Sequence, residues 1–278
     1  MAGPLMALGK ERTRRARRVA AASRATPQPA ASGETPQRTP ATRWQAVDLL
    51  RGIALMAMIV YHFCFDLAWH GWLKADFGED LHWIWFRIPI LASFLLLAGL
   101  SLALAEAHRQ AARHFWRRVG VIALAAALVS AGSYAMFAES FIYFGVLHAI
   151  ALMSVLARPL LKAGLGRALL PLGIIVIAIG NLVQSPVFDA AWLNWIGMMT
   201  FKPRTEDYVP LFPWFGMMLL GAGAGVLVLR ARQLTEVVAR WQPPRPLRWI
   251  RWMGRHSLVI YLIHQPLLLG AMMLVPKQ

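Results

Sequence analysis

Seven long apolar stretches constrain this chain more than any other feature of its sequence. A helix needs about 20 mainly apolar residues to cross the hydrocarbon core of a bilayer. The stretches lie near residues 46–68, 84–105, 118–137, 141–161, 166–184, 209–230 and 255–275. The chain is 58% hydrophobic and only 15% charged, whereas a soluble domain is about 45–50% apolar and about 25% charged. The sequence therefore predicts an all-α integral membrane protein, a polytopic bundle of about seven transmembrane helices.

The distribution of the basic residues predicts the orientation of this bundle. A net charge of +16 is also typical of nucleic-acid-binding proteins, but Lys and Arg concentrate in the cytoplasmic loops of membrane proteins as well. With the N-terminus inside, 23 of the 29 Lys and Arg lie in the tail and the inner loops, and four lie outside. We therefore expect a cytoplasmic N-terminus, an extracytoplasmic C-terminus and no nucleic-acid partner.

The first 44 residues differ from the remainder of the chain. They are rich in Ala, Arg, Pro, Ser and Thr and contain no apolar run long enough for a signal peptide. This composition predicts a disordered basic cytoplasmic tail, although it is also that of an organellar transit peptide. Residues 45–278 would then form the membrane domain, with the amphipathic segment 187–200 at the membrane interface.

The two longer outer loops, 69–83 and 185–208, carry most of the acidic residues outside the tail and several tryptophans. They are candidates for a surface that faces a substrate. The single cysteine, Cys64, excludes an intramolecular disulfide and a cysteine-based zinc site.

Ionisable residues inside a span are costly and are the default candidates for a functional site. The first span contains Asp48 and Arg51 near its inner end and His62 and Asp66 in its outer half. Residues at i,i+4 lie above one another on a helix, so Asp66 could hold the His62 imidazole as a general base requires. An interfacial ion pair for Asp48 and Arg51, and mutual satisfaction for His62 and Asp66, are the structural alternatives.

Further candidates lie in other spans: Arg87, His148, Trp214, His264 and Gln265. Arg87 either reaches the outer interface or contacts an anion, and Trp214 would lie beside a substrate cleft. Histidines on three spans could also bind a metal, but the sequence has no HExxH-type pair, and we expect none.

Four blocks of sequence resemble the bacterial membrane proteins related to the catalytic domain of heparan-α-glucosaminide N-acetyltransferase. They are VDLLRGIALMAMIVYHFCFDL at 47–67, YFGVLHAIALMSVL at 143–156, VPLFPWFGMMLLGAGAG at 209–225 and MGRHSLVIYLIHQPLL at 253–268. The resemblance implies a bacterial inner (plasma) membrane acyltransferase that uses acetyl-CoA or another acyl-CoA. The acyl group would pass from the cytoplasm to an amino or hydroxyl group of a glycan or glycolipid outside.

The residues and the resemblance together suggest a role for each candidate. His62 would be the general base or an acyl-carrying nucleophile, and Asp66 would orient it. Arg51 would hold the CoA phosphates. His148, His264 and Gln265 would line the channel and stabilise an oxyanion. The sequence leaves open whether identical chains associate into an oligomer.

Two other classes of function are also compatible with the sequence. A proton-coupled transporter would use the intramembrane His and Asp residues as a relay. A non-catalytic scaffold would use its basic tail to bind anionic lipid or a partner.

Overall fold

The computed structural model describes residues 44–274, and all regular elements in this range are helical apart from one isolated parallel bridge between Phe144 and Tyr208. The predicted basic tail lies almost wholly outside the described residues. The longer helices are α2 (Gln45–Trp69), α3 (Leu81–Ala107), α4 (Ala112–Met136), α5 (Val146–Lys162), α6 (Leu169–Leu182), α7 (Leu211–Arg230) and α10 (Ser257–Met273). Short helices connect them: η1 (Leu165–Arg167), η2 (Pro186–Asp189), η3 (Asn194–Ile196), α8 (Arg232–Arg240), η4 (Arg245–Leu247) and α9 (Arg248–Arg255).

The seven longer helices coincide with the seven apolar stretches, which confirms the all-α prediction for the described residues. Of these helices, α2, α3, α4 and α7 are long and apolar enough to cross a membrane. A fifth crossing results if η4, α9 and α10 are one span with a bend of 85°. Since α6 has 14 residues and α5 has 17, the number seven for the spans remains a prediction, as does their orientation.

One segment, the start of the fourth apolar stretch, differs locally from the sequence prediction. The fourth apolar stretch predicts a helix from about residue 141, but α5 begins at Val146. The preceding loop is held instead by hydroxyl groups, because Ser133 Oγ accepts from Ile142 N at 2.9 Å and Ser130 Oγ donates to Ile142 O at 2.5 Å. Segment 187–200 forms an irregular loop with the short turns η2 and η3, and its position relative to a membrane interface remains a prediction.

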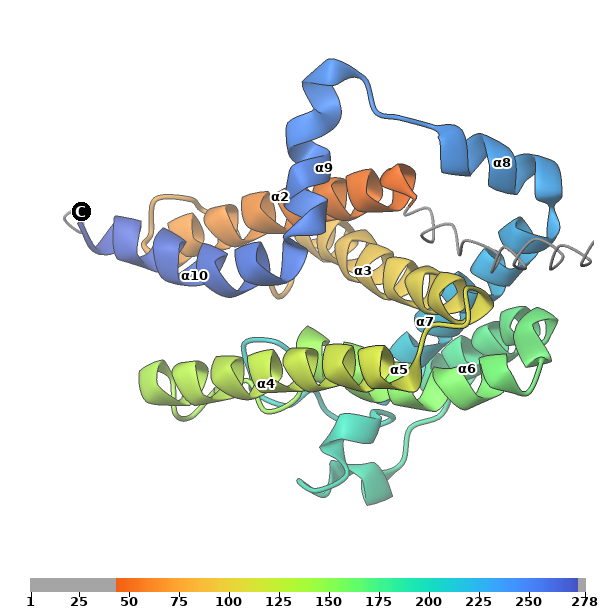
Figure 1. Cartoon of the computed structure of the whole chain (residues 1–278). Coiled ribbons are helices and arrows are strands. Elements are labelled where there is room, and N and C mark those ends of the chain that lie inside the picture. Colours follow the sequence, from red (N-terminus) through yellow and green to blue (C-terminus); the bar gives the residue numbers. More distant parts are fainter. Residues whose placement is uncertain (1–43, 275–278) are drawn as a thin grey trace, which may run out of the picture. The chain divides into compact units, whose positions relative to one another are not determined.

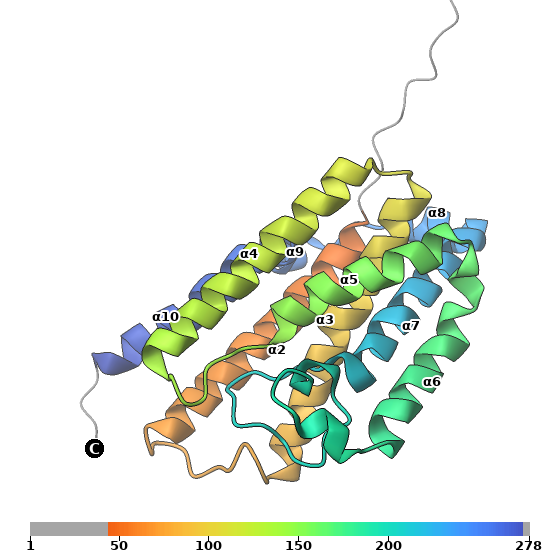
Figure 2. The same ribbon diagram turned by 90° about the horizontal axis from the view of Figure 1, so that it is seen from below.

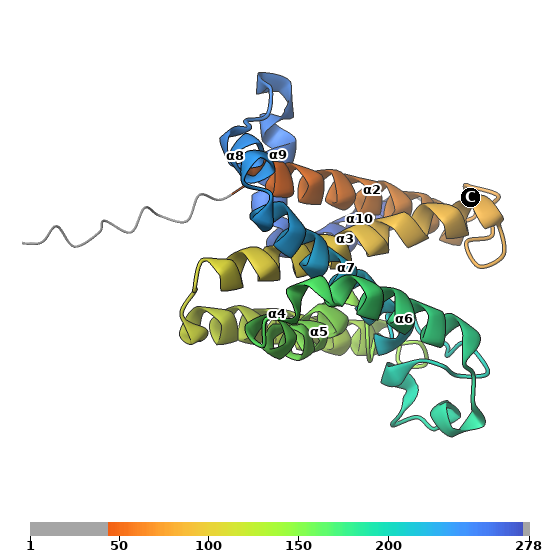
Figure 3. The same cartoon turned by 90° about the vertical axis from the view of Figure 1, so that its right-hand side faces the viewer.

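The helices form two groups on either side of α7. Figures 1 and 3 show α2, α3 and α10 on one side and α4, α5 and α6 on the other. The crossing of α3 and α7 depends on glycine, because a Cβ at Gly99 would overlap Met218 O and one at Gly221 would overlap Leu96 O. Small residues allow such close approach of helices in membranes, and this contact joins the two groups.

The main buried cluster lies where α3, α5 and α7 meet. Its fully buried members include Leu95, Ala149, Met153, Met218 and Leu219. Figure 2 shows α5 passing beside α3 and α7, with the loop before α5 close to the segment that precedes α7. The packing fixes the ends of α5 and α7, and therefore the loop 183–210 that connects α6 with α7.

Candidate active site

His62 on α2 and His264 on α10 face each other. Their ring centroids are 5.1 Å apart, and the ring planes are inclined by 59°. His264 is 8% exposed, and His62 is partly buried. The fold thus joins two of the predicted histidines, from positions 202 residues apart in the chain.

The contacts of His264 show which of its ring nitrogens carries the hydrogen and which has no hydrogen-bond partner among the described residues. Its Nδ1 lies 2.6 Å from Tyr261 O. A carbonyl oxygen only accepts, so Nδ1 carries the hydrogen, and in a neutral ring Nε2 carries the lone pair. Nε2 is buried and has no hydrogen-bond partner among the described residues. A buried polar atom without a partner costs free energy and is a feature of functional sites.

Asp66 contacts Gln265, the residue that follows His264. The Gln265 amide donates to both carboxylate oxygens of Asp66, at 2.9 and 3.1 Å, and Asp66 is only 2% exposed. No hydrogen bond between Asp66 and His62 is found in the described part of the chain. The carboxylate therefore ties α2 to α10 beside the histidine pair, and a catalytic role for Asp66 remains a prediction.

His148 lies in the first turn of α5, with both nitrogens engaged. Its Nδ1 accepts from Gly145 N at 3.3 Å, so in the neutral ring Nε2 carries the hydrogen. Nε2 lies 3.2 Å from Ser130 Oγ, which in turn donates to Ile142 O. No hydrogen bond or ring contact joins His148 to His62 or His264 among residues 44–274. This network positions the loop before α5, and the predicted place of His148 in a channel remains untested.

Asp207 is a residue near the candidate site that the sequence pattern does not reveal. Its Oδ2 accepts from Val146 N at 2.9 Å, at the start of α5, where a carboxylate interacts favourably with the helix dipole. A Cβ at position 145 would overlap this carboxylate, so Gly145 allows its approach. Burial raises the pKa of Asp207, while the hydrogen bond from Val146 and the charge of Arg87 lower it. In the sequence, Asp207 resembles any other acid of an outer loop.

Arg87 on α3 lies near the loop 183–210. Its charge contributes to the pKa shifts of two residues of that loop, Asp207 and Lys202. The pKa of Lys202 is lowered mainly by burial and further by Arg87. Arg87 itself is exposed, so its position agrees with either prediction for this residue, contact with an anion or extension to the interface.

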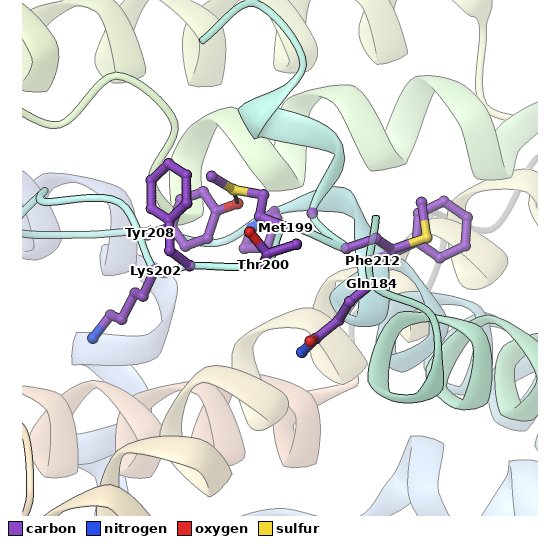
Figure 4. Close-up of a pocket in the computed structure, with 10 residues that line it drawn as sticks. Gln184, Met199, Thr200, Lys202, Tyr208 and Phe212 are labelled. Carbon is purple, nitrogen blue, oxygen red and sulfur yellow. Dashed lines mark hydrogen bonds between the residues drawn. The ribbon is translucent and has the colours of Figure 1, made fainter. Parts of the chain in front are cut away.

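A cavity of ≈ 260 Å³ lies in the same loop, where α6 ends and α7 begins. Figure 4 shows Gln184, Thr200, Lys202 and Tyr208 among the residues that line it. Neither His62 nor His264 contributes to this lining. The predicted Trp214 is partly buried against the main cluster, so the structure places it in the packing near the start of α7.

Arg51 lies near the opposite end of α2 from His62. Its guanidinium bonds Asp48 Oδ1 at 3.3 Å and Ser101 Oγ at 2.8 Å. Arg51 and Asp48 form a largely buried ion pair, and its position at a membrane interface remains a prediction. His62 lies eleven positions after Arg51 on the same helix, which corresponds to roughly 16 Å along the axis.

Comparisons with known proteins then identify the family. No curated protein and no solved structure matches the chain. The family model described as "Heparan-alpha-glucosaminide N-acetyltransferase, catalytic" matches residues 43–266, a range that includes both histidines of the pair and Asp66. The chain is therefore an integral membrane protein that belongs to the family of the heparan-α-glucosaminide N-acetyltransferase catalytic domain.

Proposed function

We propose that this protein is a membrane acyltransferase that moves an acetyl or acyl group from acyl-CoA to an amino or hydroxyl group of a glycan or glycolipid. The donor would bind on the cytoplasmic side and the acceptor on the opposite side of a bacterial inner membrane. Membership of an acetyltransferase family supports an enzyme of this class. The observation that carries the proposal is the His62–His264 pair, in which the buried Nε2 of His264 has a free lone pair.

In the proposed reaction, one imidazole of the pair takes the proton of the acceptor N–H or O–H group. The acceptor atom attacks the thioester carbonyl, the C–S bond breaks, and the imidazolium returns the proton to the CoA sulfur. The free lone pair supports His264 as this base, although the sequence alone favoured His62. The carbonyl of Tyr261 holds His264 in the tautomer that this role requires.

Asp66 and Gln265 would position the pair rather than react. The hydrogen bonds between them join the two helices that carry the histidines. Gln265 Oε1 is buried without a partner in the described residues, and it could accept a hydrogen bond from an amine or hydroxyl acceptor.

Arg51 is proposed to attract the CoA phosphates on the cytoplasmic side. A guanidinium is well suited to phosphate, and the roughly 16 Å from Arg51 to His62 is of the order of an extended acyl-pantetheine arm. Because Arg51 also bonds Asp48 and Ser101, we expect neighbouring arginines to contribute to this binding.

The test is a transfer assay in vesicles that contain the purified protein. Acetyl-CoA labelled in its acetyl group is added on one side, and oligosaccharides with free amino or hydroxyl groups are enclosed on the other. We expect labelled product inside the vesicles together with stoichiometric CoA outside. Movement of a glycan across the membrane without CoA release would contradict the proposal and favour a transporter.

A further inference from the structure

The segment that links α7 to α10 leaves an apolar side of α8 uncovered. One side of α8 packs, because Val238 and Ala239 contact the buried cluster of Trp44, Val47 and Leu97. Leu234, which is i,i+4 from Val238, and Val237 lie at the edge of this packed side, and they are 46% and 65% exposed. At helical spacing, Trp241 continues this apolar side beyond the end of the helix, and it is exposed as well.

The next helix, α9, crosses α2 instead of running along it. It is held there by close contact, since a Cβ at Gly254 would overlap Asp48 O and one at Gly52 would overlap Ile250 O. Arg251 also donates to Gln45 Oε1 at 2.6 Å. Figure 1 shows α9 crosswise to α2 and α10, and the bend between α9 and α10 is 85°. If α10 crosses the membrane, α9 therefore lies close to the membrane plane.

Two tryptophans of α9, the next helix of the same segment, are exposed as well. Trp249 and Trp252 are more than half exposed. We use the term tryptophan surface for these two residues together with Leu234, Val237 and Trp241, the exposed apolar residues of α8 and its end. Tryptophan favours the interface between headgroups and acyl chains, and a helix in the membrane plane presents such side chains at this depth.

The segment that carries the tryptophan surface is strongly basic. Five exposed arginines lie in the same segment: Arg232, Arg240, Arg245, Arg248 and Arg255. The one acid in the sequence from 230 to 255 is Glu236, which is close to Arg232 at 3.3 Å and to Arg240 at 4.0 Å. A single carboxylate cannot neutralise five guanidinium groups, so the surface remains cationic.

We propose that the tryptophan surface binds the anionic headgroups of phospholipids in the leaflet next to the end of the bundle where α2 begins. The apolar side chains enter the interface, and the exposed arginines of the same segment hold the lipid phosphates. Charge complementarity selects this occupant, because basic residues at a membrane surface attract anionic lipids and guanidinium groups bind phosphate bidentately. This binding is independent of acyl transfer.

The test uses the purified full chain in detergent and native mass spectrometry. The probes are dioleoyl phosphatidylglycerol, which is anionic, and dioleoyl phosphatidylcholine, which is neutral overall. One variant replaces Arg232, Arg240, Arg248 and Arg255 with Gln. The matched control replaces four other exposed cations at helix ends, Arg113, Arg117, Lys162 and Arg167, with Gln. Thermal unfolding checks that both variants are folded.

The chain is expected to bind phosphatidylglycerol more tightly than phosphatidylcholine. The first variant should weaken binding of phosphatidylglycerol by roughly tenfold or more, and the control should retain most of it. A Trp249→Ser/Trp252→Ser variant should weaken binding of both lipids. Equal binding of the two lipids, or an equal loss in the control, would overturn the proposal. So would a preference for an acidic peptide such as polyglutamate over phosphatidylglycerol.

Discussion

The hydrogen bonds of the ring nitrogens distinguish His264 from His148. His264 has one nitrogen fixed by a backbone carbonyl and the other buried without a partner among the described residues. His148 has partners for both nitrogens, from its own loop and from Ser130. A residue that is already satisfied can position a loop, whereas an unsatisfied lone pair can take a proton. This difference assigns the proposed chemistry to the pair of His62 and His264.

The contact between Asp66 and Gln265 predicts that two substitutions of Asp66 differ in their effect on stability. Asp66→Ala leaves the Gln265 amide buried without an acceptor and should lower the free energy of unfolding by about 1–3 kcal/mol. Asp66→Asn can still accept from the Gln265 amide, and its own NH₂ can donate to Gln265 Oε1. Thermal unfolding in detergent should place Asp66→Asn near the parent and Asp66→Ala clearly below it. Equal loss in both would contradict the assigned hydrogen bonds.

The buried carboxyl of Asp207 predicts a pH dependence of stability. Burial raises its pKa in the folded state, so the folded protein binds the proton more tightly than the unfolded chain does. This contribution to stability is fully present below 3.8, the ordinary pKa of an aspartic acid side chain, and is lost as the pH rises through the raised value. Asp207→Asn keeps an acceptor for Val146 N and removes the titration.

Unfolding midpoints of the parent and of Asp207→Asn should therefore diverge as the pH rises from about 4 towards neutrality. The variant is expected to be the more stable of the two at neutral pH. If the midpoints of the two proteins changed in parallel over this pH range, titration of Asp207 would not be the cause of the pH dependence of stability.

At the level of the helices, close contact at glycine determines how the two groups are joined. Gly99 of α3 and Gly221 of α7 each meet backbone of the other helix, and the same kind of contact holds α9 on α2. These contacts fix where the helix ends lie, and through them the positions of α10 and His264.

Gly99→Ala is expected to lower the free energy of unfolding by about 1–3 kcal/mol or more, because the added methyl group forces α3 and α7 apart. The matched control is Gly120→Ala in α4, where nothing lies within 4 Å of the added Cβ. That substitution should stabilise by about 0.5–1 kcal/mol. Chemical or thermal unfolding measures both, and a neutral Gly99→Ala would mean that the crossing is looser than described.

For the whole molecule, much of the fold could be predicted from hydropathy. The apolar stretches locate α2, α3 and α7 to within a few residues, because burial in lipid demands long apolar helices. The start of α5 could not be predicted in this way. There, the residues before Val146 are apolar too, and hydrogen bonds from Ser130 and Ser133 keep them out of the helix.

The candidate site was predictable only in part. A histidine within an apolar span is conspicuous, so His62 and His264 could be found in the sequence. Their pairing depends on how α10 packs on α2, which no pattern within either helix determines. The hydrogen-bond partner of Asp66 also depends on packing between helices. The i,i+4 spacing within α2 suggested His62, whereas the packing of α10 on α2 brings Gln265 to the carboxylate.

The orientation proposed for the bundle predicts which loops can be labelled from outside the cell. In a Cys64→Ala background, a single cysteine at Lys74, between α2 and α3, should react with a membrane-impermeant maleimide on intact spheroplasts. A single cysteine at Arg109, between α3 and α4, should react only after permeabilisation. The reverse pattern would invert the topology and place the acyl-CoA side at the opposite end.

The most direct test of the central claim is the rate of acetyl transfer by single-histidine variants in the vesicle assay. Because the free lone pair belongs to the His62–His264 pair, His264→Ala and His62→Ala should each lower the rate by a factor of about 100 or more. The control, His114→Ala, changes an exposed histidine of α4 and should transfer at the parent rate. Full activity in both His62→Ala and His264→Ala, with folding intact, would contradict the account.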